Sequence, residues 1–105
     1  MPKPPVEVAD TAADALIRRR YRARTTLTPG GTQAGVSMAR DLKNRRPIGT
    51  KRLLRMRAWF ARHDTAAQRR NREANAFSRA SIAWDLWGGD EGRAWCITEL
   101  KKVGL

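Results

Sequence analysis

The sequence has few of the side chains that catalysis or metal binding needs. Among its 105 residues there is one cysteine, Cys96, and one histidine, His63, and they lie far apart in the chain. A single cysteine cannot form a disulfide within the chain, and in an apolar stretch such as this one it is normally buried and unreactive. A metal site needs several ligands in close register. We therefore predict that the protein is not an enzyme and has no catalytic residues, no metal site and no cofactor.

Long apolar segments are also missing. No run of about 18 uncharged apolar residues occurs, and the N-terminus has no apolar segment of the kind found in secretory signals, so we predict neither a membrane span nor secretion. Gly30, Gly31 and Thr32 precede an expected helix, but without the further glycines or the lysine of a nucleotide site. An ordinary turn with a threonine cap is the favoured interpretation, and an anion cradle at the helix N-terminus is the alternative.

Acidic residues are scarce, and they are unevenly distributed. There are 22 Lys and Arg against 10 Asp and Glu, a net charge of +12. Residues 18–72 carry 17 of the basic residues, 15 of them arginine, against two acids, whereas residues 1–17 and 73–105 are slightly acidic. A face that served only solubility would mix the two signs. A block of one sign attracts polyanions, and the planar guanidinium group of arginine can bind a phosphate through two hydrogen bonds.

Three clusters within this block are the predicted nucleic-acid-binding residues. If about six of their side chains reach the phosphates of a duplex, the slope of log affinity against log salt should be about −5. A basic face that is merely solvated is the alternative explanation, and binding to an anionic membrane is disfavoured because the apolar face of the first arginine-rich helix is small. The predicted binding residues are Arg18, Arg19, Arg20, Arg22, Arg24, Arg40, Lys43, Arg45, Arg46, Lys51, Arg52, Arg55 and Arg57.

The remaining patterns are helical. Apolar residues recur at intervals of three and four, and no segment alternates as a strand does. Cap and turn residues, including a turn at 25–32, place helices at about residues 11–24, 32–44, 50–63, 78–87 and 90–103, with 64–77 left open between a loop and a marginal helix. Three prolines within residues 1–9 favour extended backbone. The predicted fold is therefore all-α: a compact bundle of four to five short helices in one basic domain, residues 11–105, behind a flexible proline-rich arm, residues 1–10.

Individual residues are predicted to begin these helices and to fill the core. Gly35 inside the second helix costs about 1 kcal/mol against alanine, so we expect another backbone to pack closely against it. The predicted caps are Thr11, paired with Asp14, and then Thr32, Thr50, Ser78 or Ser81, and Asp90. The positions predicted to face the core are Ala13, Leu16, Ile17 and Tyr21; Val36, Ala39 and Leu42; Leu53, Met56, Trp59, Phe60 and His63; Ile82, Ala83, Leu86 and Trp87; and Ala94, Ile97, Leu100 and Val103.

The four tryptophans raise the question of base stacking. Trp84, Trp87 and Trp95 lie in the near-neutral C-terminal part beside apolar residues, so packing in the core or at a partner interface is the favoured interpretation. Trp59 lies between Arg57 and Arg62, and it is the one tryptophan for which stacking on a nucleic-acid base is a reasonable alternative.

Three segments carry a distinctive order of motifs. They are GGTQAGVSMARDLKNRR at 30–46, RMRAWFARH at 55–63 and SIAWDLWGGDEGRAW at 81–95, of which the Trp-Gly-Gly-Asp motif is the most specific. In this order they resemble a small domain of tailed phages, over roughly residues 12–97. The chain departs from that domain at DTAAQRRNREANAF, where members carry a link rich in glycine and proline. The resemblance implies a phage-encoded protein from a head-assembly or virion gene region, located in the virion or the host cytoplasm.

Two functions are consistent with these observations. The first is a phage protein that binds the phosphate backbone of DNA or RNA with little reading of base sequence. The second is a structural virion protein, such as a minor head, cement or connector component, whose arginines contact acidic capsid neighbours and whose N-terminal arm orders on assembly. An inhibitor that mimics nucleic acid is disfavoured, because such mimics are usually acidic.

Overall fold

A computed structural model describes residues 1–25 and 28–105, and the described residues form six helices and no strand. The helices are α1 (Val6–Thr25), α2 (Gln33–Lys43), α3 (Thr50–Arg62), α4 (Ala66–Ala74), α5 (Arg79–Leu86) and α6 (Gly89–Lys102). The predicted all-α class is confirmed. Thr26 and Leu27 of the predicted turn at 25–32 lie outside the described residues.

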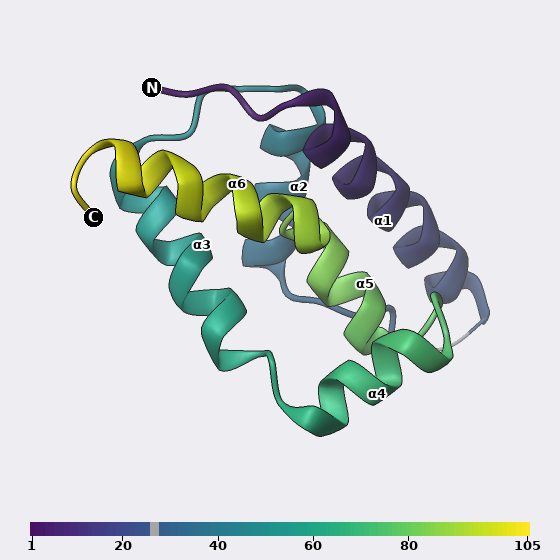
Figure 1. The fold of residues 1–105 in the computed structure, drawn as a ribbon. Coiled ribbons are helices and arrows are strands. Elements are labelled where there is room, and N and C mark those ends of the chain that lie inside the picture. Colours follow the sequence, from purple (N-terminus) through teal and green to yellow (C-terminus); the bar gives the residue numbers. More distant parts are fainter. Residues whose placement is uncertain (26–27) are drawn as a thin grey trace.

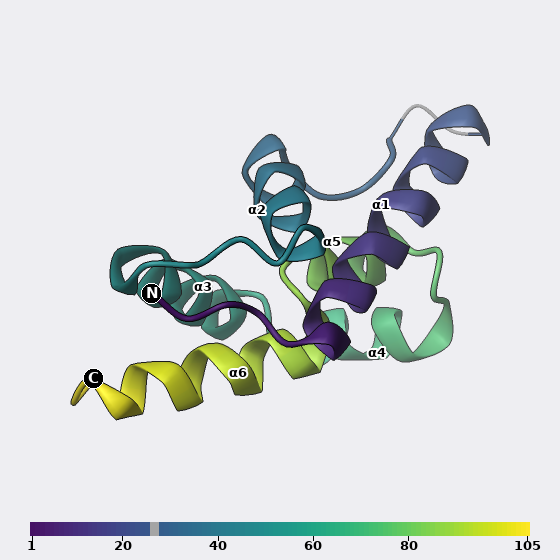
Figure 2. The ribbon, with the colours of Figure 1, turned by 90° about the horizontal axis from the view of Figure 1, so that it is seen from above.

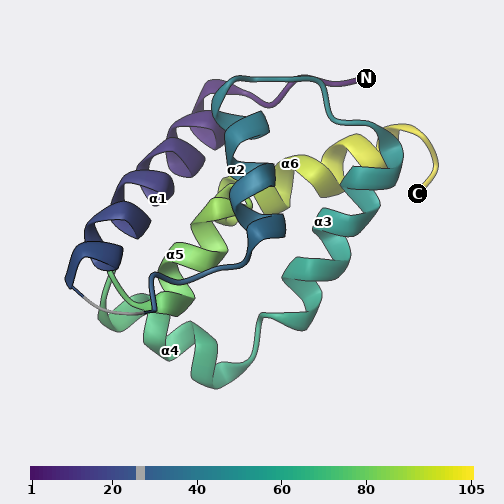
Figure 3. The same ribbon diagram turned by 180° about the vertical axis from the view of Figure 1, so that it is seen from behind.

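The helices surround α5, which contacts α1, α2, α4 and α6 (Figure 1). α1 packs on α2 and α5, whereas α3 packs on α6. Seen from behind, α2 ends near the beginning of α1, and the connection 44–49 leads from there to α3 (Figure 3). The C-terminal end of α1 therefore lies about one helix length, roughly 30 Å, from the end of α2. The basic residues in the C-terminal half of α1 therefore lie far from those at the end of α2.

The N-terminal segment differs from the prediction of a flexible arm over residues 1–10. α1 begins at Val6, and Pro4 is buried. The backbone N–H of Ile48 donates to the carbonyl of Pro2 at 2.9 Å, and Arg45 Nε donates to the carbonyl of Pro4 at 2.9 Å. The prolines signal a helix start as well as extended chain, since the missing N–H and fixed φ of proline suit the first turn of a helix. The sequence-based prediction considered only extended chain and not a helix start.

The buried face of α1 agrees only in part with the predicted one, in that Leu16 packs against the core. Ile17 and Tyr21 are 65% and 59% exposed, whereas Ala12 and Ala15 are fully buried with Val8 at the same face. Alanines let α2 and α5 approach α1 closely, and this close packing outweighs the greater apolarity of the isoleucine and tyrosine. Both large side chains are left at the surface as a result.

Cap predictions for α2 and α5 are confirmed. The Thr32 hydroxyl accepts from Gly35 N–H at 3.2 Å, and the Ser78 hydroxyl accepts from Ser81 N–H at 3.1 Å. Thr50, a predicted cap, is instead the first residue of α3, which follows Gly49. The close neighbours of Gly35 are the side chains of Trp87 and Leu86, not the backbone that was predicted.

The segment 64–77, which the sequence left open, contains α4. Thr65 and Gln68 form a reciprocal capping box at its start, and Thr65 Oγ1 accepts from Gln68 N–H at 3.2 Å. No residue of α4 is buried. Such a short polar helix gains little from packing, so its caps and ion pairs carry much of its stability.

The Trp-Gly-Gly-Asp motif joins α5 to α6. Gly88 has φ = 101°, a left-handed conformation that ends α5 and at the same time begins α6. Asp90 was predicted to cap the last helix, but its Oδ1 instead accepts from Trp84 Nε1 at 2.9 Å. The predicted apolar stripe of α6 is confirmed at Leu100, which is fully buried, and wrong at Val103, which is 59% exposed; Cys96, outside that stripe, is fully buried.

Candidate nucleic-acid interface

The structure separates the thirteen predicted binding residues into two groups. The first comprises Arg18, Arg19, Arg20, Arg22 and Arg24 in the C-terminal half of α1. The second group, which we call the corner patch, lies where α2 turns into α3 and comprises Arg40, Lys43, Arg45, Arg46, Lys51, Arg52, Arg55 and Arg57. Figure 2 shows the end of α1 projecting away from α3. The second and third predicted clusters are linked through Asp41, which binds Arg46 of one and Arg52 of the other, but the first cluster lies apart from them.

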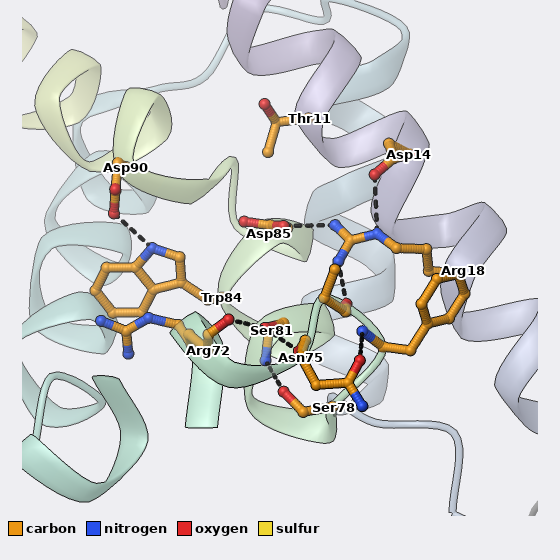
Figure 4. Close-up of polar contacts among 12 residues, drawn as sticks. Thr11, Asp14, Arg18, Arg72, Asn75, Ser78, Ser81, Trp84, Asp85 and Asp90 are labelled. Carbon is orange, nitrogen blue, oxygen red and sulfur yellow. Dashed lines mark hydrogen bonds and ion pairs between the residues drawn. The ribbon is translucent and has the colours of Figure 1, made fainter. Parts of the chain in front are cut away.

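Arg18 is an interior residue. Its side chain is 9% exposed and forms ion pairs with Asp14, one turn earlier, and with Asp85 of α5 (Figure 4). It also donates to the carbonyl of Ala76 in the α4–α5 connection. A phosphate could reach this guanidinium group only by replacing these partners, so in the structure Arg18 holds α1 against α5.

Arg19 and Arg22 are also engaged by their own chain. Arg19 Nε donates to the carbonyl of Gly30 at 2.9 Å. Arg22 donates to the carbonyls of Thr28 and Phe77, at 2.7 and 2.9 Å. These bonds tie the end of α1 to the loop before α2 and to the α4–α5 connection.

Arg20 and Arg24 are the outward pair of the same helix segment. Both are exposed, and neither has a hydrogen bond or ion pair with any residue that the structure describes. They are four residues apart and so share one face of α1. They are available for an external anion.

The corner patch is shaped by the end of α2. Arg45 has φ = 51°, and the N–H groups of Arg45 and Arg46 donate to the carbonyls of Leu42 and Asp41 at 3.0 and 2.9 Å. This is the Schellman arrangement, in which a left-handed residue, usually glycine, ends a helix. Here Arg45 adopts this left-handed conformation, and its side chain reaches the segment just before α1.

Asp41 is the carboxylate of the corner patch. Arg46 and Arg52 bind its two oxygens at 2.9 and 2.8 Å. Burial disfavours the ionised form, but the hydrogen bonds and charges of these two arginines outweigh it, so the pKa of Asp41 is lowered from its ordinary value of 3.8. Its two oxygens are therefore bound by Arg46 and Arg52, two of the eight cations of the corner patch.

Four cations of the corner patch are left over. The side chains of Arg40, Lys43, Lys51 and Arg55 are exposed and have no hydrogen bond or ion pair within residues 1–25 and 28–105. The eighth, Arg57, donates to the Leu105 carbonyl at 2.6 Å. The local excess of positive charge is uncompensated on the side of α2 and α3 that faces solvent.

Sequence reasoning missed an acidic cavity on the opposite side of the molecule. It has a volume of about 750 Å³ and lies between α1, α4, α5 and α6 (Figure 4). Its acidic residues are far apart in the sequence, and no local pattern unites them. They are Asp10, Asp14, Asp64, Glu73, Asp85, Asp90 and Glu91, and they are accompanied by Arg18, Arg69, Arg72 and Arg93.

All four arginines of this cavity form ion pairs, and they do so with three of its seven acids, Asp14, Asp64 and Asp85. Arg93, Arg72 and Arg69 lie 3.0, 3.2 and 3.4 Å from the carboxylate of Asp64 and lower its pKa. Burial raises the pKa of Asp85, although Arg18 opposes the shift. The carboxylates of Asp14, Asp64 and Asp85 thus bind the arginines of this cavity, and none of the three is paired with an arginine of the corner patch.

A second cavity, of about 830 Å³, opens between the Gly-Gly-Thr turn, α4 and α5, and no carboxylate lines it. Its lining includes Gly30, Gly31, Thr32, Trp59, His63, Gln68, Asn71, Asn75, Arg79 and Trp87. The Gly-Gly-Thr turn, for which an anion cradle was the alternative to an ordinary capped turn, therefore borders a cavity free of negative charge.

The tryptophans belong to the core. Trp84 and Trp87 are 4% exposed, as predicted, and Trp59 is 8% exposed. Trp59 stacks on Trp87 with ring centroids 5.1 Å apart, and on His63 at 4.2 Å. Stacking of Trp59 on a nucleic-acid base is therefore not favoured, because neighbouring rings already cover it.

Two other aromatic residues reach the surface. Tyr21 and Phe77 are 59% and 41% exposed, and their rings meet edge to face with centroids 5.3 Å apart. The sequence analysis assigned Tyr21 to the core and did not consider Phe77. A signal was present, since Arg24 lies three residues after Tyr21 on the same helix face and Arg20 directly precedes it, a basic setting unsuited to burial.

Reactive side chains are not assembled in the described parts of the chain. Cys96 is buried, and burial raises the pKa of its thiol to about 11. His63 Nδ1 lies 2.8 Å from the carbonyl of Trp59, in the structural setting predicted for it. Within residues 1–25 and 28–105, no group of three or more histidine, cysteine or acidic residues could hold a metal ion.

No helix in the described part of the chain has the length and apolarity to cross a membrane. No known family, curated protein or solved structure matches the sequence or the fold of this chain. The resemblance to a tailed-phage domain therefore stays a prediction.

Proposed function

We propose that the protein binds nucleic acid through the phosphate backbone and that the corner patch is the principal contact. The observation that carries this proposal concerns four exposed cations whose side chains have no partner among the described residues. They are Arg40, Lys43, Lys51 and Arg55, and the patch's one carboxylate, Asp41, is bound to two other arginines. Like charges held on one surface repel each other, and a polyanion relieves that repulsion.

The chemistry of the patch favours phosphate over base recognition. Its unpartnered groups are long, solvated cations, which bind the regularly spaced charges of a backbone without reading sequence. DNA and RNA present the same phosphate, so the corner patch would bind both. Weak sequence preference and strong dependence on salt follow from this mode of binding.

The test is a salt titration of binding to a fluorescent duplex, followed by anisotropy. Four phosphate contacts predict a slope of log affinity against log salt of about −4. The triple variant Arg40→Gln, Lys43→Gln and Arg55→Gln should flatten this slope by about 2.7. Each phosphate contact that is lost leaves about 0.9 fewer counterions to be released on binding.

A control variant loses the same number of positive charges outside the corner patch. It distinguishes the effect of the corner patch from the effect of the total charge. Arg62, Arg70 and Lys101 are exposed and unpartnered within the described residues, but lie outside the corner patch. Their replacement by glutamine should leave the slope nearly unchanged. Equal effects of the two triple variants would contradict the assignment to the corner patch.

Absence of salt-dependent binding would contradict the proposal as a whole. The alternative, that the patch contacts an acidic neighbour in a virion, would then be favoured. Recovery of the protein in nuclease-treated particles without retained nucleic acid would support that alternative.

A further inference from the structure

The end of α1 and the α4–α5 connection form a small surface that combines aromatic rings with free cations. We call it the aromatic patch, and it consists of Ile17, Arg20, Tyr21, Arg24 and Phe77. The four α1 residues follow the spacing i, i+3, i+4, i+7, so they share one helix face. Ile17, Tyr21 and Phe77 are 65%, 59% and 41% exposed. Large apolar side chains gathered in this way at a surface mark a binding site more often than isolated ones do.

The aromatic pair is held in position by the inward arginines of the same helix. Arg18 donates to the carbonyl of Ala76, and Arg22 Nη1 donates to the carbonyl of Phe77 at 2.9 Å. The N–H of Phe77 donates to Asn75 Oδ1 at 2.8 Å. These contacts fix the connection against α1, so that Phe77 meets Tyr21 edge to face. The rings are thus pre-positioned at the surface.

The charge of the patch restricts its partner. Arg20 and Arg24 have no partner among the described residues. The acid closest along this helix, Asp14, lies one turn before Ile17 and is bound to Arg18. A ligand that combines a flat apolar group with a negative charge complements this arrangement. Nucleotides of a single strand have that combination in each unit, a base with two open faces and a phosphate.

We propose that the aromatic patch binds single-stranded nucleic acid, with a base stacked against Tyr21 and Phe77 and the adjoining phosphates on Arg20 and Arg24. The bases of a duplex are stacked on each other and cannot offer a face to these rings, so the patch discriminates strands from duplexes. This inference goes beyond the proposed duplex contact at the corner patch, which lies at the other end of α1 (Figure 3). An anionic membrane is the competing occupant, but three apolar side chains give it little area to bury.

The experiment compares two labelled strands of about 12 nucleotides, an oligothymidylate and an abasic strand with the same number of phosphates, a length within the range of single-strand binding sites. Their affinity ratio measures what the bases add to phosphate binding. We expect the full-length protein to bind the oligothymidylate at least about tenfold more tightly. Tyr21→Leu, which keeps apolar area but removes the ring, should bring the ratio close to one. Tyr21→Phe should leave the ratio unchanged.

Other outcomes overturn the inference. An affinity ratio near one in the unmodified protein, or a ratio that Tyr21→Leu leaves unchanged, would show that bases do not stack on the patch. Binding to vesicles of phosphatidylcholine with one third phosphatidylserine, retained in Tyr21→Leu, together with a ratio near one would assign the patch to a membrane. The duplex titration is read separately, because the corner-patch variant leaves Tyr21 and Phe77 in place and Tyr21→Leu leaves the corner patch intact.

Discussion

Two pairs of arginines on α1 have the same spacing and opposite roles. Arg18 and Arg22 face inward and bind carboxylates or carbonyl groups of other segments. Arg20 and Arg24 lie between and after them, face solvent and have no partner among the described residues. A shift of two positions along a helix turns the side chain by about 200°, so neighbours in sequence belong to different surfaces.

The difference shows that the number of arginines in a segment overstates its capacity to bind an external anion. Of the thirteen predicted residues, seven bind groups of their own chain, namely Arg18, Arg19, Arg22, Arg45, Arg46, Arg52 and Arg57. The remaining six are exposed and unpartnered within the described residues. Whether a cation is structural or available depends on which carbonyl or carboxylate the fold brings to it.

The strongest test of this contrast is Arg18→Met. Methionine keeps most of the buried volume but leaves Asp85 without its cation and the Ala76 carbonyl without its donor. Removing one partner of a buried ion pair costs about 3–5 kcal/mol. We expect a loss of this size in the free energy of unfolding, measured by urea denaturation followed by circular dichroism.

Two companion variants make that result specific. Adding Asp85→Asn to Arg18→Met should recover part of the loss, because the amide carries no uncompensated charge into the interior. Arg20→Met, on the outward face, should change stability by less than about 0.5 kcal/mol. Equal losses of unfolding free energy in Arg18→Met and Arg20→Met would contradict the different roles assigned to the two faces of α1.

The dependence of stability on pH compares two aspartates in different environments, Asp41 and Asp85. We expect this dependence to change the free energy of unfolding by less than Arg18→Met does. The pKa of Asp41 is lowered by Arg46 and Arg52, so its ionised form stabilises the fold above its unfolded pKa of 3.8, and this contribution is lost as the pH falls through the folded value. The pKa of Asp85 is raised by burial, so its contribution has the opposite sign: it is present below pH 3.8 and is lost as the pH rises through the folded value.

Urea midpoints measured at about pH 6 and about pH 3 test these signs. Asp41→Asn should narrow the difference between the two midpoints, because the variant lacks a group that loses its charge in acid. Asp85→Asn should widen it. A change of the same sign in both variants would show that the two carboxyl groups are not in opposite environments.

Much of the fold could be predicted because its signals are local. Thr32 and Ser78 cap the helices that follow them, and the apolar spacing of Val36, Ala39 and Leu42 places their side chains in the core as predicted. Each of these signals lies within a few residues of the structure that it specifies. The all-α class follows from them.

The features that could not be predicted depend on contacts between distant residues. Arg18 is buried because Asp85, 67 positions later, pairs with it, and no pattern near Arg18 reveals that partner. Ile17 and Tyr21 are more apolar than the alanines of α1, yet the alanines face the core because they allow close helix packing. The acids of the 750 Å³ cavity come from four helices and from the connection between α3 and α4. Such arrangements exist only in the folded chain.

The smallest expected effect on stability belongs to the double variant Arg20→Gln and Arg24→Gln, and it is the most direct test of the outward pair. Removing two like charges four residues apart relieves a repulsion of about 0.2–0.5 kcal/mol. Losing Arg24 from the last turn of α1 removes a favourable interaction of similar size with the helix dipole. The two terms offset each other, so the unfolding free energy should change by less than about 0.5 kcal/mol, while the slope of single-strand affinity against salt should flatten by about 1.4. A protein that loses stability but keeps its salt dependence would show that the outward arginines are structural after all.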